Sequence, residues 1–188
     1  MTKGLIVVLS GASSVGKQKI RDLVLKDKQL NLFYSVSMTT RPKKANETNG
    51  KDYYFVSYER FAQAVKEKEL LEFTQVNGYY YGTPIQQIDF LIDKGTNVLI
   101  EVEAQGVGQI KLIRPEAIAF FVMPKSLDEL EKQLHERYKD NAFSIDERLA
   151  KARMEMELAP LFRYTVQADQ PKEAAAFILK TVKEALAQ

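Results

Sequence analysis

Residues 5–19, LIVVLSGASSVGKQK, combine the residue types and the spacing needed to bind a phosphate group. A short apolar run leads into a loop bounded by Gly11 and Gly16, and Lys17 opens a predicted helix. In such a loop the backbone N–H groups, the positive end of the helix and the lysine ammonium face the anion. A strand-to-helix turn without a ligand is the alternative. The candidate phosphate-binding residues are Gly11, Ala12, Ser13, Ser14, Val15, Gly16, Lys17 and Gln18.

The metal-binding half of this signature is altered. In the full pattern a Ser or Thr follows the lysine, and its hydroxyl holds Mg²⁺. Gln18 and Lys19 stand at those positions, so one offers only a neutral carbonyl oxygen and the other a cation. The sequence therefore leaves the metal ligands unassigned.

A second candidate anion site follows at residues 35–44, SVSMTTRPKK. Hydroxyl groups alternate along a predicted strand, and basic residues come directly after it. Hydroxyls donate to phosphate oxygens, Arg41 can donate two parallel N–H groups, and Lys44 adds a positive charge. From composition alone, a polar edge strand with a solvated basic loop explains the segment better.

A carboxylate among aromatic residues lies in a predicted hairpin at residues 71–83. Glu72 can accept N–H groups from the edge of a nucleobase while a hydroxyl donates to a carbonyl group. Glu103 lies at the end of a predicted central strand, and ligands of open parallel sheets lie beyond the carboxyl ends of the strands. An amphipathic hairpin with Glu72 exposed to solvent is the alternative.

Three arginines surround a polar break between two predicted helices: Arg137, Arg148 and Arg153. Arginines that converge from a loop can stabilise the charge that spreads over a phosphoryl group during its transfer. Ordinary helix-surface charge is the alternative, because several glutamates lie nearby in the sequence.

The composition excludes several classes of site. The 188 residues include no cysteine, so disulfides, thiolate metal sites and cysteine nucleophiles are ruled out. His135 is the only histidine, which argues against a zinc site or a histidine-based triad. The net charge of +2, from 27 basic and 25 acidic residues, argues against nucleic acid or a membrane as partner. No apolar run approaches the ~20 residues of a membrane span, and the start is a poor signal peptide, so we expect a cytoplasmic protein.

Apolar runs of strand length alternate with helix-period segments along the chain, which predicts an α/β fold with a parallel sheet and helices on both faces. Two predicted helix starts, Ser126 with Glu129 and Ser144 with Glu147, have the pattern of a capping box. Strands are predicted at 5–9, 98–102, 118–123 and 164–167, and helices at 17–28, 58–68, 84–94, 126–137, 144–158 and 172–187.

Residues 35–83 break this alternation. Short strands, one helix and a tight turn at Asn77 and Gly78 predict a small, mostly antiparallel insert. The insert is rich in tyrosine and phenylalanine, and the polar stretch 41–51 within it is predicted to be a surface loop.

Together these motifs resemble the guanylate kinase family, over the chain from Leu5 to about Asp169. The resemblance implies a nucleoside-monophosphate kinase fold of the P-loop type, in three layers. A core at 1–34 and 84–188 would hold ATP, an insert at 35–83 would hold GMP, and a lid at 137–148 would close. The segments that carry the resemblance are SVSMTTR (35–41), NGKDYYF (49–55), YYGTP (80–84), EVEAQGV (101–107) and ERLAKARMEME (147–157).

The resemblance also implies an activity: ATP-dependent phosphorylation of GMP, and of dGMP, in purine nucleotide metabolism. Lys17 would hold the ATP phosphates, and Arg137 and Arg148 would act on the transferring phosphoryl group. Mg²⁺ would enter with ATP, and the protein would be a monomer or a homodimer. The GMP phosphate is assigned to Ser37, Arg41, Lys44, Tyr53 and Tyr81, and the guanine to Glu72, Thr83 and Glu103.

Several positions depart from the family's usual pattern, mostly on the ATP side. A β-carbon at position 14 is harmful only if that residue needs a positive φ. Because the changes gather on one side, a module that binds GMP or another phosphorylated ligand with weak or no catalysis is the alternative function. The departures are Ala12 for proline, Ser14, Asn46 and Tyr138 for glycine, Gln18 and Lys19 for hydroxyl residues, Lys44 and Gln133 for arginine, and Ala168 for asparagine.

Overall fold

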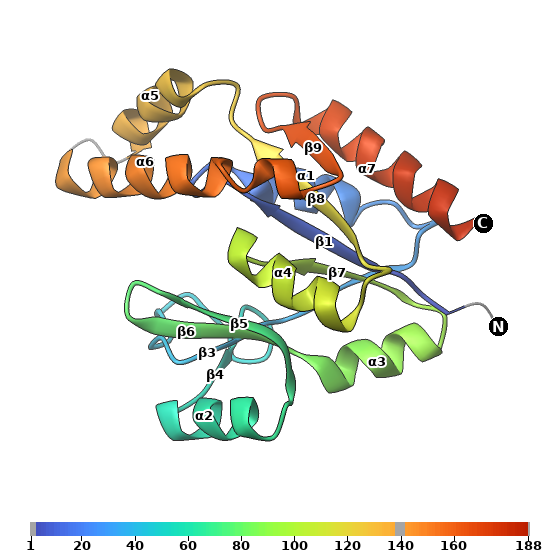
Figure 1. Cartoon of the computed structure of the whole chain (residues 1–188). Helices are drawn as coiled ribbons and strands as arrows, with labels where there is room; N and C mark the ends of the chain where they lie inside the picture. Colours follow the sequence, from blue (N-terminus) through green and yellow to red (C-terminus); the bar gives the residue numbers. More distant parts are fainter. Residues whose placement is uncertain (1–2, 138–141, 188) are drawn as a thin grey trace. The chain divides into compact units, whose positions relative to one another are not determined.

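The computed structural model describes residues 3–137 and 142–187, except for the side chains at 137 and 142–144. The chain divides into two compact units (Figure 1). Unit 1 consists of Met1–Ile6 and Leu32–Ala117, and unit 2 consists of Val7–Asn31 and Ile118–Gln188. The domain boundaries at residues 34 and 84 and the lid at 137–148 stay predictions; residues 138–141 of that lid lie outside the described residues.

The predicted parallel sheet is confirmed, with five strands in the order β2-β7-β1-β8-β9 (Figure 1). All six residues of β1 are buried, as are four of the five in β7, which is typical of strands covered on both faces. The edge strand β2 was not predicted, because three half-buried residues are too few to show an alternation. The strands are β1 (Ile6–Gly11), β2 (Leu32–Tyr34), β7 (Asn97–Glu101), β8 (Ile118–Met123) and β9 (Tyr164–Gln167).

Unit 1 contains the predicted insert, a four-stranded sheet in the order β4-β3-β6-β5. Strand β6 pairs antiparallel with both β5 and β3, and only β3 with β4 is parallel, so the mostly antiparallel prediction is confirmed. Asn77 and Gly78 have φ values of 51° and 81°, the left-handed pair that a two-residue hairpin turn requires. The strands are β3 (Met38–Thr39), β4 (Tyr54–Phe55), β5 (Leu70–Val76) and β6 (Tyr79–Pro84).

Three helices belong to unit 1: α2 (Tyr58–Lys66), α3 (Ile85–Asp93) and α4 (Ala104–Ile113). The first two confirm predicted helices to within two residues. Helix α4, which packs against β5, was not predicted. Its sequence AQGVGQIKLI carries two glycines, which lower helix propensity and leave gaps in the apolar period.

Unit 2 contains α1 (Lys17–Val24), α5 (Leu127–Arg137), α6 (Ala142–Met156), a short 3₁₀ helix (Ala159–Leu161) and α7 (Pro171–Leu186). Helix α1 packs against α7, and α5 packs against α6. Helix α1 ends four residues before the predicted end. There, Asp27 Oδ1 accepts the N–H groups of Gln29 at 2.9 Å and Leu30 at 3.2 Å, which favours a turn over another helical turn.

One of the two predicted capping boxes is confirmed in part. Ser126 Oγ accepts the N–H of Glu129 at 3.1 Å, at the start of α5. The box at Ser144 is wrong, because α6 begins two residues earlier, at Ala142.

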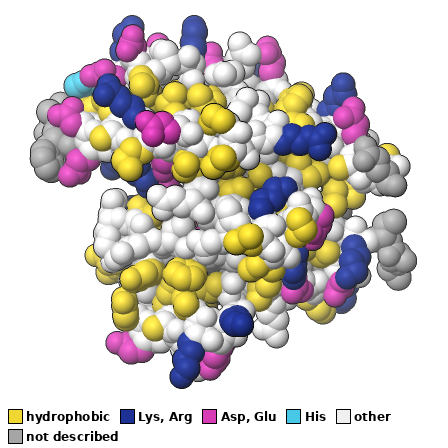
Figure 2. Space-filling view, viewed as in Figure 1, with side chains coloured by type: hydrophobic (Ala, Val, Ile, Leu, Met, Phe, Trp, Pro, Cys, Tyr) yellow, Lys and Arg dark blue, Asp and Glu magenta, His cyan; other side chains and the backbone are white. Residues whose placement is uncertain are grey.

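The described residues include no helix that is both long and apolar enough to span a membrane. On the face drawn in Figure 2, basic and acidic side chains are intermingled and form no extended basic patch. This distribution agrees with the near-balanced net charge of the sequence.

Candidate active site

The loop at residues 11–16 connects β1 to α1, as predicted, and its two glycines are required by its geometry. Gly11 has a φ of +148°, and a β-carbon there would lie 2.4 Å from the carbonyl oxygen of Val122. Gly16 has a φ of +91° and directly precedes Lys17, the first residue of α1. The loop therefore turns into the N-terminus of a helix, which is the backbone arrangement that binds phosphate.

Lys17 bends back over this loop. Its Nζ donates to the carbonyl oxygens of Gly11 at 3.0 Å and Ala12 at 3.2 Å. The N–H of Ala12 in turn donates to Val122 at 3.1 Å, which ties the loop to β8. These contacts place a positive charge at the loop, where the sequence predicted it.

Ser14 occupies a left-handed backbone conformation, with a φ of +63°. A residue with a β-carbon pays about 1–2 kcal/mol for this conformation, whereas glycine adopts it freely. Position 14 needs a positive φ, which is the condition under which the absence of glycine is harmful.

Helix α6 brings two charged side chains to the loop. Arg148 Nη1 donates to Ser14 Oγ at 3.4 Å, and Glu155 Oε2 accepts the N–H of Ser13 at 2.5 Å. Glu155 is only 5% exposed, and Lys151 Nζ lies 3.6 Å from its other oxygen. Glu155 was not singled out from the sequence, although its spacing of seven residues from Arg148 places both on one face of a helix.

The structure gives no such contact with the loop for the other two predicted arginines, Arg137 and Arg153, among the described residues. The side chain of Arg137 lies outside the described residues. Arg153 is exposed on α6, so the surface-charge alternative holds for it.

A pocket of about 490 Å³ opens beside the loop within unit 2. Its lining includes Ser14, Val15 and Gly16 of the loop, together with side chains from α1, α5 and the segment after β9. Four positions that depart from the pattern seen in the sequence analysis line this one pocket: Ser14, Lys19, Gln133 and Ala168.

Unit 1 holds the predicted base-reading residues. Phe73 of β5 pairs with Gly82 of β6, which sets Glu72 beside Thr83. Thr83 Oγ1 donates to Glu72 Oε1 at 2.6 Å, and the two residues are only 1% and 4% exposed. The alternative of a solvent-exposed Glu72 is therefore wrong.

Burial raises the pKa of Glu72 from 4.5 to about 7, opposed by the hydrogen bond from Thr83 and assisted by the negative charge of Glu103. Glu103 lies between β7 and α4, directly before the first residue of the helix. A carboxyl group with this pKa holds its proton weakly near neutrality, and N–H donors placed against it would favour the ionised form.

Helix α4 packs against β5 and lies next to the carboxylate of Glu72. A β-carbon at Gly106 would lie 2.5 Å from Glu72 Oε2, so any larger residue would force the carboxylate to shift. The Gln109 amide donates to the carbonyl of Phe73 at 2.8 Å and accepts its N–H at 3.1 Å, which fixes β5 next to Glu72. Neither residue was singled out from the sequence, because α4 itself was not predicted.

Arg41 is held in a compact cluster in unit 1. Its Nη2 and Nη1 donate to the two carboxylate oxygens of Glu47 at 2.8 and 3.0 Å. The guanidinium carbon lies 5.4 Å from the ring centre of Tyr53 and 5.5 Å from that of Phe55. The Tyr81 ring lies 5.8 Å from the Tyr53 ring. The alternative of a fully solvated basic loop is wrong for Arg41, whose side chain is 16% exposed.

The remaining predicted phosphate ligands lie at the edge of this cluster. Lys44 has an exposed side chain, and its N–H donates to Glu47 at 2.8 Å. Ser37 directly precedes β3, and its carbonyl accepts the N–H of Tyr54 at 2.9 Å. Glu47, which was not singled out from the sequence, thus contacts the guanidinium of Arg41 and the backbone N–H of Lys44.

Strand β6 links the two groups of residues in unit 1. Tyr81 and Thr83 are two residues apart on it, so their side chains share one face of the sheet about 7 Å apart. The Arg41 cluster, predicted to bind phosphate, and the pair of Glu72 and Thr83, predicted to bind guanine, therefore lie next to each other within one unit.

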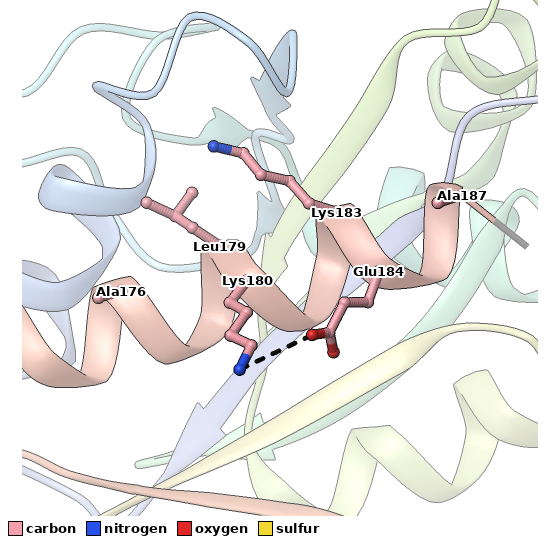
Figure 3. Close-up of a pocket in the computed structure, with 6 residues that line it drawn as sticks. All are labelled: Ala176, Leu179, Lys180, Lys183, Glu184 and Ala187. Carbon is pink, nitrogen blue, oxygen red and sulfur yellow. Dashed lines mark ion pairs between the residues drawn. The ribbon is translucent and has the colours of Figure 1, made fainter.

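A different pocket lies along α7, with lysines that are already engaged (Figure 3). Lys180 Nζ lies 3.8 Å from Glu184, one turn further along the helix. Lys183 Nζ donates to Asp27 at 2.8 Å and to Gln29 at 2.9 Å. An anion in this pocket would therefore meet two lysines that are already paired with other side chains.

The chain is similar to known proteins over nearly all of its length. The family model described as guanylate kinase matches residues 3–188. A guanylate kinase of Thermus thermophilus is 42% identical over 177 residues, covering 94% of this chain and 80% of that protein. A guanylate kinase of Lactobacillus johnsonii is 38% identical, covering 97% and 89%. The crystal structure of guanylate kinase from Anaplasma phagocytophilum matches with a TM-score of 0.81 and 26% identity, covering all of this chain and 89% of that one. The chain belongs to the guanylate kinase family.

Proposed function

We propose that this protein transfers the terminal phosphoryl group of ATP to GMP, and to dGMP, and releases ADP and the diphosphate. The observation that carries the proposal is the buried pair of Glu72 and Thr83, 2.6 Å apart and beside the Arg41 cluster in a member of this family. A base-reading carboxyl next to an anion-binding guanidinium is complementary to a guanine nucleotide with a terminal phosphate.

In the proposed acceptor complex, the ionised Glu72 accepts the N–H groups of the guanine edge, and the Thr83 hydroxyl lies beside it. Adenine offers a carbonyl-free edge with a different donor pattern, so the same pair discriminates against AMP. Arg41, Tyr53 and Tyr81 hold the phosphate, with Ser37 and Lys44 at the edge of the cluster. The stacked and paired surroundings of Arg41 orient its guanidinium before the ligand arrives.

In the proposed donor complex, the triphosphate binds to the backbone N–H groups of residues 11–18, and Lys17 moves from the loop carbonyls to a phosphate oxygen. Arg148 already reaches the loop at Ser14, and Arg137 is proposed to act with it. Phosphoryl transfer needs no covalent intermediate on the enzyme. Orientation of the two phosphates and neutralisation of the charge that spreads over the transferring group supply the catalysis.

The two positions after Lys17 do not supply the hydroxyl that the full pattern offers to Mg²⁺. Gln18 and Lys19 are exposed and carry no hydroxyl, and the described residues contain no cluster of three or more acidic, His or Cys side chains suited to a metal ion. When present, the ion would supply charge neutralisation on the triphosphate itself. Mg²⁺ bound to ATP and a cytoplasmic location remain parts of the proposal.

The direct test is a coupled assay of ADP release with ATP, Mg²⁺ and a series of nucleoside monophosphates. We expect turnover with GMP, weaker turnover with dGMP, and no turnover above background with AMP, CMP or UMP. Lys17→Ala serves as the control, because it removes the loop ammonium and leaves the acceptor residues in place.

Two outcomes would contradict the proposal. Turnover equal to that of Lys17→Ala would remove the kinase activity and leave a binding module, which calorimetry with GMP alone would then identify. Equal turnover with AMP and GMP would remove the proposed role of Glu72 and Thr83.

A further inference from the structure

The pocket beside the 11–16 loop differs in charge from the pattern that holds a metal ion. A magnesium-binding loop offers a neutral hydroxyl after its lysine. Here Gln18 is exposed and does not line the pocket, whereas Lys19 does. Lys19 lines the pocket together with Ser14 and Gly16 of the loop, so its side chain borders the space that the phosphates of a bound triphosphate would enter.

A second lysine, Lys125 after β8, lines the same pocket, and Asp169 contributes one acidic group. Within the described residues, neither Lys19 nor Lys125 has an ion-pair partner. The α7 pocket of Figure 3 provides the contrast, because its lysines pair with Glu184 and Asp27. Two cations beside a phosphate-binding loop can therefore act on a ligand.

We propose that Lys19 takes the place of the divalent ion in donor binding, so that this protein binds the metal-free tetra-anion of a nucleoside triphosphate at least as tightly as its magnesium complex. The inference rests on the proposed function only in placing the triphosphate at the loop. It does not require that GMP is the acceptor or that transfer occurs.

Charge explains the preference. A lysine ammonium attracts the same phosphate oxygens that a divalent ion would bridge, and it repels a divalent ion placed next to it. The metal-free triphosphate also carries two more negative charges than its magnesium complex, and Lys17, Lys19 and Lys125 can interact with them. A hydroxyl at position 19 would favour the magnesium complex instead, because it carries no charge and its oxygen can coordinate a cation.

The test is the dissociation constant of ATP for the intact protein without GMP, measured by calorimetry in excess Mg²⁺ and again in EDTA. For the unmodified protein we expect the constant in EDTA to be equal to or lower than that in Mg²⁺. We expect Lys19→Met to weaken binding in EDTA by about tenfold, the loss of one close charge interaction. Binding in Mg²⁺ should change far less. Inorganic triphosphate in EDTA should follow the same pattern, because it carries the phosphates without the base.

Lys180→Met is the matched control, since it makes the same change at an ion-paired lysine in the α7 pocket and should alter neither constant. Thermal melting checks that each variant folds, which is expected because both side chains are exposed. The inference is overturned if the unmodified protein binds ATP only with Mg²⁺, if neither form binds, or if Lys19→Met weakens both forms equally. A protein that phosphorylates GMP but needs Mg²⁺ to bind ATP would retain the proposed function and lose this inference. Metal-free binding of ATP without turnover of GMP would retain this inference and contradict the proposed function.

Discussion

The candidate residues of unit 1 and of unit 2 are held in different ways. In unit 1 the charged and polar groups are paired with each other, as in the buried Glu72 with Thr83 and the half-buried Arg41 with Glu47. In unit 2 the loop glycines and Lys17 are in place, but the neighbouring pocket is lined by residues that depart from the family pattern. The proposed acceptor side is therefore a polar network of paired side chains, and the proposed donor side is a loop with the predicted backbone geometry and altered side chains.

The difference follows from the cost of substitution in the two regions. Removing one member of a buried pair leaves the other without a partner, which costs several kcal/mol. Lys19 and Gln133 are exposed, so a change at either position leaves no buried group unpaired. The pocket beside the loop, proposed to bind the donor, can vary in charge while the loop keeps its shape, and the five predictions below separate the two regions by experiment.

The largest effect is expected at the buried carboxyl of unit 1. Glu72→Gln keeps the shape and the hydrogen bond from Thr83 but removes the negative charge that is proposed to accept the guanine N–H groups. We expect GMP binding to weaken by about 10- to 150-fold, the range for a hydrogen bond to a charged group, with ATP binding unchanged. Calorimetry with each nucleotide measures both, and Glu59→Gln, an exposed residue of α2, is the control. An equal loss of ATP binding would show that the two regions are not separable.

The same variant has an effect of opposite sign on stability. The pKa of Glu72 is raised from 4.5 to about 7 in the folded protein, so the folded state binds the extra proton between these values. The stabilisation of the folded state by this proton is therefore fully present below pH 4.5 and is lost as the pH rises through 7. Above pH 7 we expect Glu72→Gln to be more stable than the unmodified protein by about 3 kcal/mol, and at pH 4.5 to be equal to it. Urea unfolding at the two pH values checks this, and an unchanged difference between them would contradict the buried, proton-binding state of Glu72.

A smaller loss is expected when the orientation of Arg41 is disturbed. Glu47→Gln leaves one acceptor oxygen for the guanidinium and removes the ion pair. We expect GMP binding to weaken by about five- to tenfold, because part of the orientation of Arg41 must then be fixed by the ligand. A fluorescence or calorimetric titration with GMP gives the number. Tighter GMP binding would show instead that Glu47 competes with the phosphate for Arg41.

On the donor side, the double substitution Gln18→Ser with Lys19→Thr restores the hydroxyl residues of the metal-binding pattern. We expect turnover with MgATP to rise several-fold, since a hydroxyl at the loop is the group that coordinates the ion in this signature. The KM for GMP should stay the same, because none of the GMP residues is altered. Unchanged or lower turnover would mean that the loop does not bind the metal in the way the pattern implies.

The smallest effect is expected at Ser14. Replacement by glycine relieves the left-handed conformation but increases the freedom of the unfolded chain, so the net gain is about 0.5–1 kcal/mol. Thermal melting should show a rise of about 1–4 °C for a chain of this size. A fall in the melting temperature would show that the contact between Ser14 and Arg148 outweighs the relief of strain.

The elements with strong periodic signals could be predicted from the sequence, and the weak ones could not. Strands β8 and β9 begin and end where the apolar runs predict, and the loop glycines give the start of α1. Strand β2 is too short to show a period, and the glycines of α4 hide its helical pattern. Both are defined by contacts with β7 and β5, which are distant in sequence.

The candidate site shows the same limit. Side chains that could contact a ligand directly, such as Glu72 and Arg41, were found from residue type and context. The groups that hold these side chains in place were not found from the sequence. Glu47 pairs with Arg41, Gln109 bonds to β5, Gly106 lies against Glu72, and Glu155 bonds to the loop. Such supporting residues carry no chemistry that marks them in a sequence, because their role depends on a partner that only the fold brings near.

The central claim is tested most directly by following ATP and GMP together through one reaction and quantifying all four nucleotides by chromatography. The account predicts that one GDP forms for each ADP, at a rate that falls to background in Lys17→Ala. ADP formed without an equal amount of GDP, or no nucleotide conversion beyond that of Lys17→Ala, would contradict it.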